Sequence, residues 1–177
     1  MEEDLGRAAL GGFIDASVAT TVGLMLPEPT IGEQGTPEGG DLIFNKGGGL
    51  TDPVGLFLSY LQGAPISHNA IAISSTQQAD SHVKGNGTRI RNIDFNRQGR
   101  LVKWSGSGNQ KFVALAVQYG KDNAFKYWLG PKREICSTFI GRVASETGLS
   151  TPGFSPASQY YNIQGIQFYN TYGVRER

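Results

Sequence analysis

Short apolar runs alternate with polar turns along this chain, and their spacing predicts mainly strands. Asp41 to Phe44 is a short apolar run, and Ile66 to Ser74 alternates apolar and small residues with a period of two. Glycine, serine and asparagine separate the runs, as in antiparallel strands joined by short turns. We therefore expect a strand meander, with further strands starting near Ser81 and covering 88–94, 100–104 and 111–119.

Helical spacing marks three other stretches. Asp52-Pro53 is a typical helix start, and the apolar residues that follow predict a short amphipathic helix ending at Gly63. From Arg133 to Thr147 the apolar residues recur every three or four positions, and Gly148 is a typical stop. A further short helix is expected around 122–129. Strands in a meander together with helices predict an α+β fold.

The first 38 residues differ from the remainder of the chain. Ala8 to Leu26 is mostly apolar but contains Asp15, whose charge disfavours a membrane span by about 3 kcal/mol. Pro27 to Gly40 is rich in proline and glycine and reads as a linker. We expect an N-terminal segment with its linker over 1–38 and a compact domain over 39–177. The N-terminal segment is either packed on the core or used for delivery or partner binding.

Composition excludes several function classes. The 177 residues carry a net charge of +1, so no overall field gathers nucleic acid or anionic lipid. A single cysteine excludes an internal disulfide and a cysteine-rich zinc site, and the two histidines lack the spacing of a helical metal pair. No phosphate-binding loop is present. We expect no metal, no cofactor, no nucleic acid partner and no stable insertion in a membrane.

Cys136 is the one thiol and lies near the start of a predicted helix. Unpaired amides and the helix dipole favour a thiolate at such a position. Lys132 and Arg133 add positive potential, which Glu134 opposes. A thiolate here could act as a nucleophile, but it needs a base from elsewhere in the fold.

His68 is the candidate base. It shares a strand face with Ala70 and Ala72, whose small side chains would let the Cys136 helix pack closely. His82 could lie on the neighbouring strand and orient the first ring, with Asp80 and Gln78 as alternatives for that third role. Taken singly, a lone cysteine in a helix or a lone histidine in a strand is more often structural, so both interpretations stay open here.

Four stretches together resemble the NlpC-type papain-like superfamily in its circularly permuted form. They are the GGDLIF strand at 39–44, the SHNAIAI strand at 67–73, the EICSTFI helix start at 134–140 and the segment GLSTPGFSP at 148–156. Here the helix motif reads Glu134-Ile135-Cys136-Ser137-Thr138-Phe139-Ile140. Histidine precedes cysteine, as in the permuted members. The sequence departs from the family pattern in Asn69-Ala70 after the histidine, in a long turn over 74–80, and in its first 38 residues.

This resemblance implies a papain-like fold in which an antiparallel meander packs against the helix carrying the nucleophile. It implies a cysteine peptidase or amidase that works through a thioester, with Cys136 as nucleophile, His68 as general base and acid, and His82 as the orienting group. Asp41 is read mainly as a structural residue of the Gly-Asp turn, and Asp41 and Asp80 are the candidate supporting residues.

The resemblance also implies substrate classes and partners. The leading hypothesis is an amide bond of a peptidoglycan peptide, and the alternative is a lipid- or ester-directed hydrolase or acyltransferase. A small hydrolase of this type is similar to toxin effectors of type VI secretion, which are made without a signal peptide, reach a target-cell periplasm, and have immunity and delivery or chaperone partners. The aromatic tail at 160–172 could line a substrate groove or pack as core. A third hypothesis is a non-catalytic binding module with an ordinary thiol.

Overall fold

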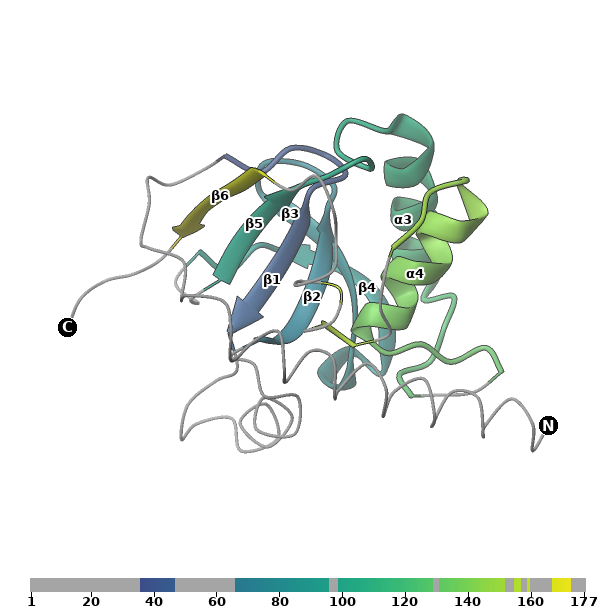
Figure 1. Ribbon diagram of the computed structural model, residues 1–177. Helices are drawn as coiled ribbons and strands as arrows, with labels where there is room; N and C mark the ends of the chain where they lie inside the picture. Colours follow the sequence, from purple (N-terminus) through teal and green to yellow (C-terminus); the bar gives the residue numbers. More distant parts are fainter. Residues whose placement is uncertain are drawn as a thin grey trace.

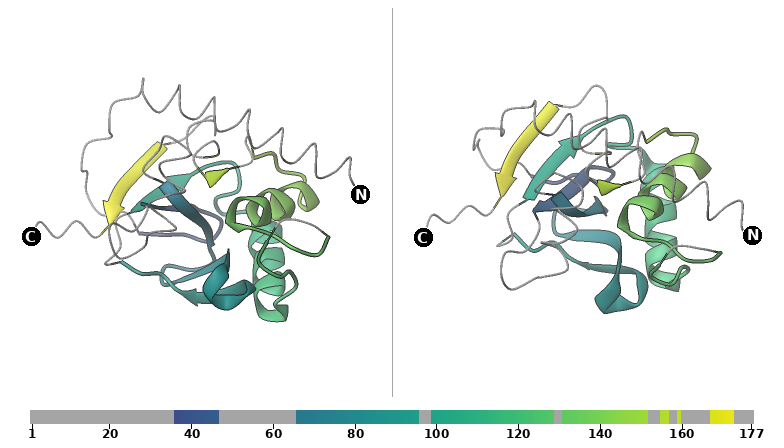
Figure 2. Two further views of the ribbon diagram at one scale, coloured as in Figure 1. Left: turned by 90° about the horizontal axis from the view of Figure 1, so that it is seen from below. Right: turned by 60° about the horizontal axis from the view of Figure 1, so that its bottom comes forward.

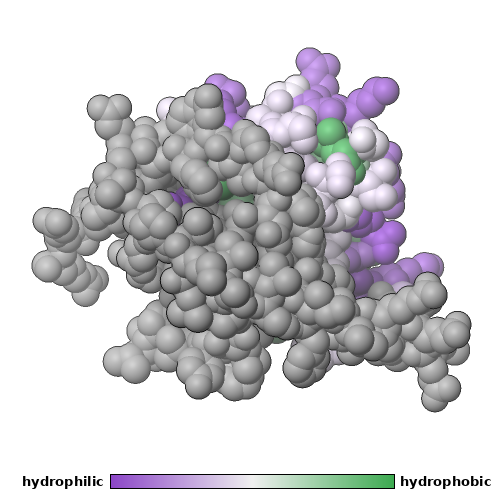
Figure 3. Space-filling view, viewed as in Figure 1, coloured by the Kyte–Doolittle hydropathy of each residue, from purple (hydrophilic) through white to green (hydrophobic). Residues whose placement is uncertain are grey.

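The computed structural model describes residues 36–46, 66–95, 99–128, 131–151, 155, 156, 159 and 167–172. The predicted N-terminal apolar segment, most of the linker and the helix expected after Asp52 lie outside these residues. Among the described residues, no helix is long and apolar enough to cross a membrane. Figure 3 shows that the described part of one face is largely hydrophilic, with a small apolar patch on the side where the helices lie.

A six-stranded antiparallel sheet forms the centre of the fold (Figure 1). Four strands follow one another as neighbours, and the fifth strand returns to pair with the first on its free side, so the order is β4-β3-β2-β1-β5-β6. The strands are β1 (Leu42–Lys46), β2 (Ile66–Ala72), β3 (Gln77–His82), β4 (Gly87–Asn92), β5 (Gly99–Lys103) and β6 (Gln167–Tyr172). The strands predicted at 41–44, 66–74, 88–94 and 100–104 are confirmed.

Two helices, α3 (Gln110–Asp122) and α4 (Cys136–Glu146), lie on the same side of the sheet (Figures 1 and 2). The α+β class is therefore confirmed. The larger core lies between sheet and helices, and a smaller apolar cluster covers the opposite face. Buried residues of the first core include Phe44, Ile71, Ala79, Val102, Phe112, Phe139 and Ile140, and those of the second are Ile43, Ala70, Ala72, Ile93 and Leu101.

The strand expected over 111–119 is wrong, because this segment forms most of α3. Val113, Leu115 and Val117 alternate as in a strand. The buried residues Phe112, Ala116 and Gly120, however, recur every fourth position, which is the helical repeat. Asn109 begins the helix, since its side chain accepts a hydrogen bond of 3.2 Å from the amide of Phe112. The serines and glycines at 105–108 read as a turn between two strands, so the sequence did not reveal this cap.

The helix expected at 122–129 is also wrong. The chain leaves the helix at Asn123, which takes a left-handed conformation (φ 46°) as the C-cap of α3. The described residues that follow, 124–128, are irregular.

Strand β3 begins earlier than the sequence predicts. The turn predicted over 74–80 shrinks to its first residues, where Ser74 Oγ accepts hydrogen bonds from the amides of Thr76 and Gln77. The polar sequence that follows conceals a strand because Gln78, Asp80 and Ser81 are buried polar groups. Consequently Asp80 and His82 lie on one strand.

Helix α4 lies on the opposite sheet face from the one predicted. The sequence predicted contact with Ala70 and Ala72, which belong to the cluster on the other face. Instead, Phe139 and Ile140 of α4 share a core with Ile71 and Ala79, because the side chain of Ile71 offers more apolar surface than an alanine. The pairing of β2 with β3 covers Ile71↔Ala79 and Ala72↔Gln78 among the described residues. His68 lies beyond this paired part, where the two strands are no longer joined.

Candidate active site

The structure brings His68, Asp80 and Cys136 together from β2, β3 and the first residue of α4. His68 Nε2 donates a hydrogen bond of 3.0 Å to Asp80 Oδ2. Because this bond uses Nε2, the ring nitrogen left for the thiol is Nδ1, and Cys136 interacts electrostatically with the same ring. The exposed fractions are 6% for His68, 5% for Cys136 and 0% for Asp80.

Asp80 is the charged centre of this group. Besides His68, its carboxylate accepts hydrogen bonds from Arg89 Nε at 3.0 Å and from Arg91 Nε at 2.7 Å. Burial opposes the ionised form, but the hydrogen bond from His68 and the positive charges around it hold the pKa of Asp80 well below its usual range. Asp80 therefore stays ionised at neutral pH.

The charge of His68 follows from these neighbours. Burial of the ring opposes protonation, but interactions with Cys136 and with the Asp80 carboxylate together raise the pKa of His68 to about 9. At neutral pH the ring is therefore an imidazolium beside the thiol. Such a pair holds a nucleophilic sulfur and an available proton in one place.

His82 takes a different position from the one predicted. Its ring contacts the His68 ring edge to face, with centroids 5.1 Å apart. Its Nδ1 accepts a hydrogen bond of 3.0 Å from the amide of Lys84, at the start of the 3₁₀ turn η1 (Val83–Gly85). Burial and the charge of His68 lower the pKa of His82 to about 4, so this ring is neutral. The group that hydrogen-bonds His68 is Asp80, one of the two alternatives offered by the sequence.

Gln78, the other alternative, lies beside Arg91. Gln78 Nε2 donates a hydrogen bond of 3.3 Å to Asp80 Oδ2. With its amide turned over, the amide oxygen would accept from Arg91 Nε at 3.0 Å and from a terminal nitrogen of Arg91 at 2.6 Å. Gln78 therefore supports the Asp80 carboxylate, either directly or through Arg91.

Asp41 lies at the opposite end of the β1–β2 pair from His68. Its carbonyl accepts from the amide of Ala72, whereas His68 pairs with Asn45 further along β1. Four residues of strand, about 13 Å, separate the two positions. Asp41 Oδ2 accepts a hydrogen bond of 2.8 Å from the amide of Glu38, so in this structure the side chain belongs to the turn before β1.

The segment before α4 is fastened to β3. Ser81 Oγ donates a hydrogen bond of 2.5 Å to the carbonyl of Glu134, and the Glu134 side chain pairs with Arg142. Thr138 Oγ1 accepts a hydrogen bond of 3.0 Å from the amide of Ile135, which closes the first turn of α4. Because Ser81 follows Asp80 directly, one strand positions both the carboxylate and the approach to the thiol.

Sequence reasoning missed the groups that surround this triad. Arg89 and Arg91 alternate on a predicted strand and thus share one face, and this spacing is the signal that could have found them. Asn69 was noted only for its strand face, but its Nδ2 donates a hydrogen bond of 2.5 Å to Gln159 Oε1. Gln159 has no sequence signal, because the contact joins residues 90 positions apart.

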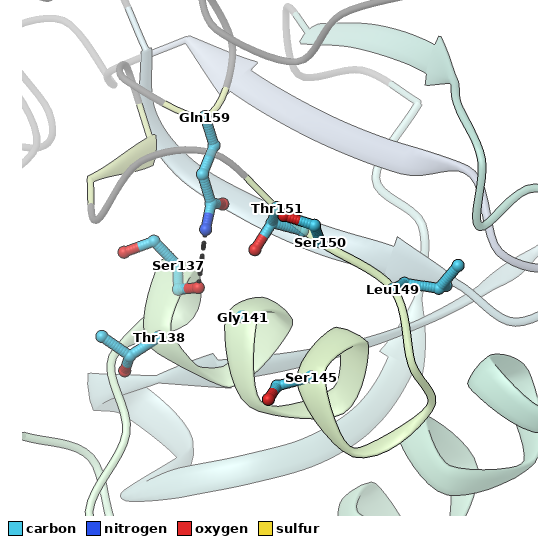
Figure 4. A pocket seen from close by; sticks show the side chains of 8 residues that line it. All are labelled: Ser137, Thr138, Gly141, Ser145, Leu149, Ser150, Thr151 and Gln159. Carbon is cyan, nitrogen blue, oxygen red and sulfur yellow. Dashed lines mark hydrogen bonds between the residues drawn. The ribbon is translucent and has the colours of Figure 1, made fainter.

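A cavity of about 300 Å³ adjoins the start of α4. Its described lining comes from one side of the helix, from the segment after it and from Gln159 (Figure 4). Gln159 Nε2 donates a hydrogen bond of 2.9 Å to the carbonyl of Ser137. The lining residues are Ser137, Thr138, Gly141, Ser145, Leu149, Ser150, Thr151 and Gln159.

Neither protein-family models nor curated proteins give a match to this sequence. Within the part of the chain that the structure describes, no group of three His, Cys, Asp or Glu residues is placed to hold a metal ion. The chemistry open to the described site is that of a thiol, an imidazole and a carboxylate in series.

Proposed function

We propose that this protein is a cysteine hydrolase that cleaves an acyl bond through a thioester. The observation that carries the proposal is the series Cys136–His68–Asp80, in which a buried carboxylate hydrogen-bonds the ring that neighbours the only thiol. A nucleophile, its base and an orienting group in this order are the parts of a catalytic triad. Asp80 replaces His82 in the proposed third role.

The reaction has two balanced steps. Cys136 Sγ attacks the acyl carbon, the bond to the leaving group breaks, and the His68 proton passes to the leaving amine, leaving a thioester on Cys136. His68 then removes a proton from a water molecule that attacks the thioester, and the thiolate leaves as the carboxylic acid forms. Free amides in the first turn of α4 suit the negative charge on the acyl oxygen.

We extend the proposal to the papain-like permuted fold. Two features support it: the chain order His68, Asp80, Cys136, and an antiparallel sheet against which a helix beginning with cysteine packs. Under this proposal the motifs at 39–44, 67–73 and 134–140 occupy β1, β2 and the start of α4.

For the substrate we propose a peptide amide, with peptidoglycan peptides as the leading class. The described cavity along α4, the helix that begins with Cys136, offers mostly hydroxyl groups and one large apolar side chain, Leu149, which suits a peptide-type group better than a lipid chain. The lipid- or ester-directed alternative predicts that the protein prefers a lipid chain or an ester to a peptide amide. The effector hypothesis, with its delivery and immunity partners, depends on residues 1–38 and stays a prediction.

Digestion of purified sacculi tests the amide hypothesis. The wild-type protein should release new muropeptides, and Cys136→Ala should lower the rate by at least about 1,000-fold with an unchanged circular dichroism spectrum. Ser75→Ala, at an exposed turn position, is the matched control and should keep full activity. Absence of products from wild-type protein, with rapid thioester capture from acyl esters, would favour the ester alternative.

The rate of Cys136 alkylation distinguishes the two enzyme hypotheses from the hypothesis of a non-catalytic binding module. An activated Cys136 should react with iodoacetamide near neutral pH faster than free cysteine, whose pKa is about 8.5. A rate equal to that of free cysteine supports the binding module instead.

A further inference from the structure

We infer that the cavity along α4 is the substrate subsite of this enzyme and takes an uncharged polar group of about the size of one amino-acid residue. This inference rests on the proposed function, because it assigns a role to the space along the helix that begins with the proposed nucleophile. A volume of about 300 Å³ is at the lower end for ligand pockets, which suits one residue rather than a long chain.

The position of the cavity connects it with Cys136. Ser137 and Thr138 line its near end and directly follow the thiol in the first turn of α4. Figure 4 shows Ser137, Gly141 and Ser145 one after another along the helix, with the segment around Thr151 beside them. A substrate whose acyl oxygen points to the amides of this first turn therefore reaches the cavity with the adjoining group.

The chemistry of the lining favours neutral groups. The described lining carries hydroxyl groups from five residues, the amide of Gln159 and Leu149, and no charged side chain among these residues. The Ser137 hydroxyl is buried and has no hydrogen-bond partner. Polar lining with a spare hydroxyl can pair with an uncharged amide or hydroxyl, whereas a buried charge would lose its hydration without a counter-charge.

Gly141 lines the cavity from the middle of α4. Glycine in a helix interior destabilises the helix relative to alanine. A Cβ atom at this position would find its nearest neighbour, Thr151 Oγ1, at 3.6 Å, which is ordinary van der Waals contact. Packing therefore does not require a glycine here, and the space it leaves belongs to the cavity.

The test compares electrophiles of different size and charge on the full chain. The alkylation rate with iodoacetamide depends on Cys136 and His68 alone, because this reagent is too small to need the cavity. Acetylated dipeptide chloromethyl ketones with Gln-Gln, Glu-Glu or Lys-Lys report the subsite. Wild-type protein should react at least about tenfold faster with the Gln-Gln reagent than with either charged one.

Two variants fill the cavity from different positions, Gly141→Leu near its middle and Ser145→Leu near its far end. Each should lower the Gln-Gln rate at least about tenfold and leave the iodoacetamide rate within about twofold of wild type. Gly141→Ala should raise Tm, which shows that the helix tolerates a side chain here. Should Gly141→Leu fail to fold, Ser145→Leu, on the exposed part of α4, decides the question.

The outcomes separate this inference from the proposed function. Unchanged Gln-Gln rates in the filled variants, or equal loss for iodoacetamide and Gln-Gln, would overturn the subsite. A wild-type Cys136 no more reactive than free cysteine toward all four reagents would instead overturn the hydrolase itself.

Discussion

At the scale of single residues, the hydrogen bond to His68 distinguishes Asp80 from the other candidates for the third role. The sequence offered His82, Asp80 and Gln78, and all three lie on one face of β3. Asp80 makes the hydrogen bond to His68, and His82 uses its Nδ1 for the amide of Lys84. The reason is reach and charge, since the buried carboxylate can hold an imidazolium and a neutral imidazole cannot.

The matched pair Asp80→Asn and His82→Gln tests this assignment. Asp80→Asn should lower kcat/KM by about 100-fold or more, because an amide cannot stabilise the charged His68 ring. It should also shift the pH dependence of Cys136 alkylation, since the pKa of His68 falls without the carboxylate. His82→Gln should keep activity within a few-fold. A greater loss for His82→Gln would return the orienting role to His82.

At the scale of elements, β3 carries more of the site than its composition suggests. It supplies Asp80, and its next residue, Ser81, donates to the Glu134 carbonyl just before α4. Strand β4 supplies the two arginines that flank Asp80. These two neighbouring strands therefore position the carboxylate, and β3 also holds the segment that leads to the thiol.

Ser81→Ala tests the link between β3 and α4. Loss of the hydroxyl leaves the Glu134 carbonyl buried without this donor, which should lower the free energy of unfolding by about 1–3 kcal/mol. Because the segment before Cys136 is then less constrained, the alkylation rate by iodoacetamide should fall as well. Ser75→Ala, measured by the same urea titration, should change stability by less than about 0.5 kcal/mol. Equal effects of the two substitutions would contradict the link.

At the scale of the whole molecule, the shifted pKa values of the site should make the free energy of unfolding depend on pH. The pKa of His68 is raised to about 9, so its contribution is complete below 6.5 and is lost as pH rises from 6.5 through 9. The pKa of His82 is lowered to about 4, so its contribution is complete above 6.5 and is lost as pH falls through 4. The lowered pKa of Asp80 adds a further loss below 3.8.

We therefore expect maximal stability near pH 6.5, with a loss of order 3 kcal/mol by pH 9 from His68. Urea unfolding across pH 4 to 9.5 measures this profile. Cys136→Ala should flatten the alkaline limb, because Cys136 is a main cause of the raised pKa of His68. His82→Gln should flatten the acid limb between 6.5 and 4. A profile that is unchanged in both variants would contradict the charge assignment.

The sequence by itself determined the strands β1, β2, β4 and β5, the helix with Cys136 at its start, and the short set of residues able to do acyl chemistry. These features depend on local spacing and on the scarcity of cysteine and histidine, which can be read without knowing the fold.

Tertiary structure decided what local spacing leaves ambiguous. The segment 111–119 fits both a strand and a helix, and packing of Phe112 and Ala116 against the sheet selects the helix. The side of the sheet that α4 covers, the pairing of His68 with Asp80, and the contact between Asn69 and Gln159 all join residues far apart in sequence. Such contacts follow from how the elements pack, and no periodicity within one element records them.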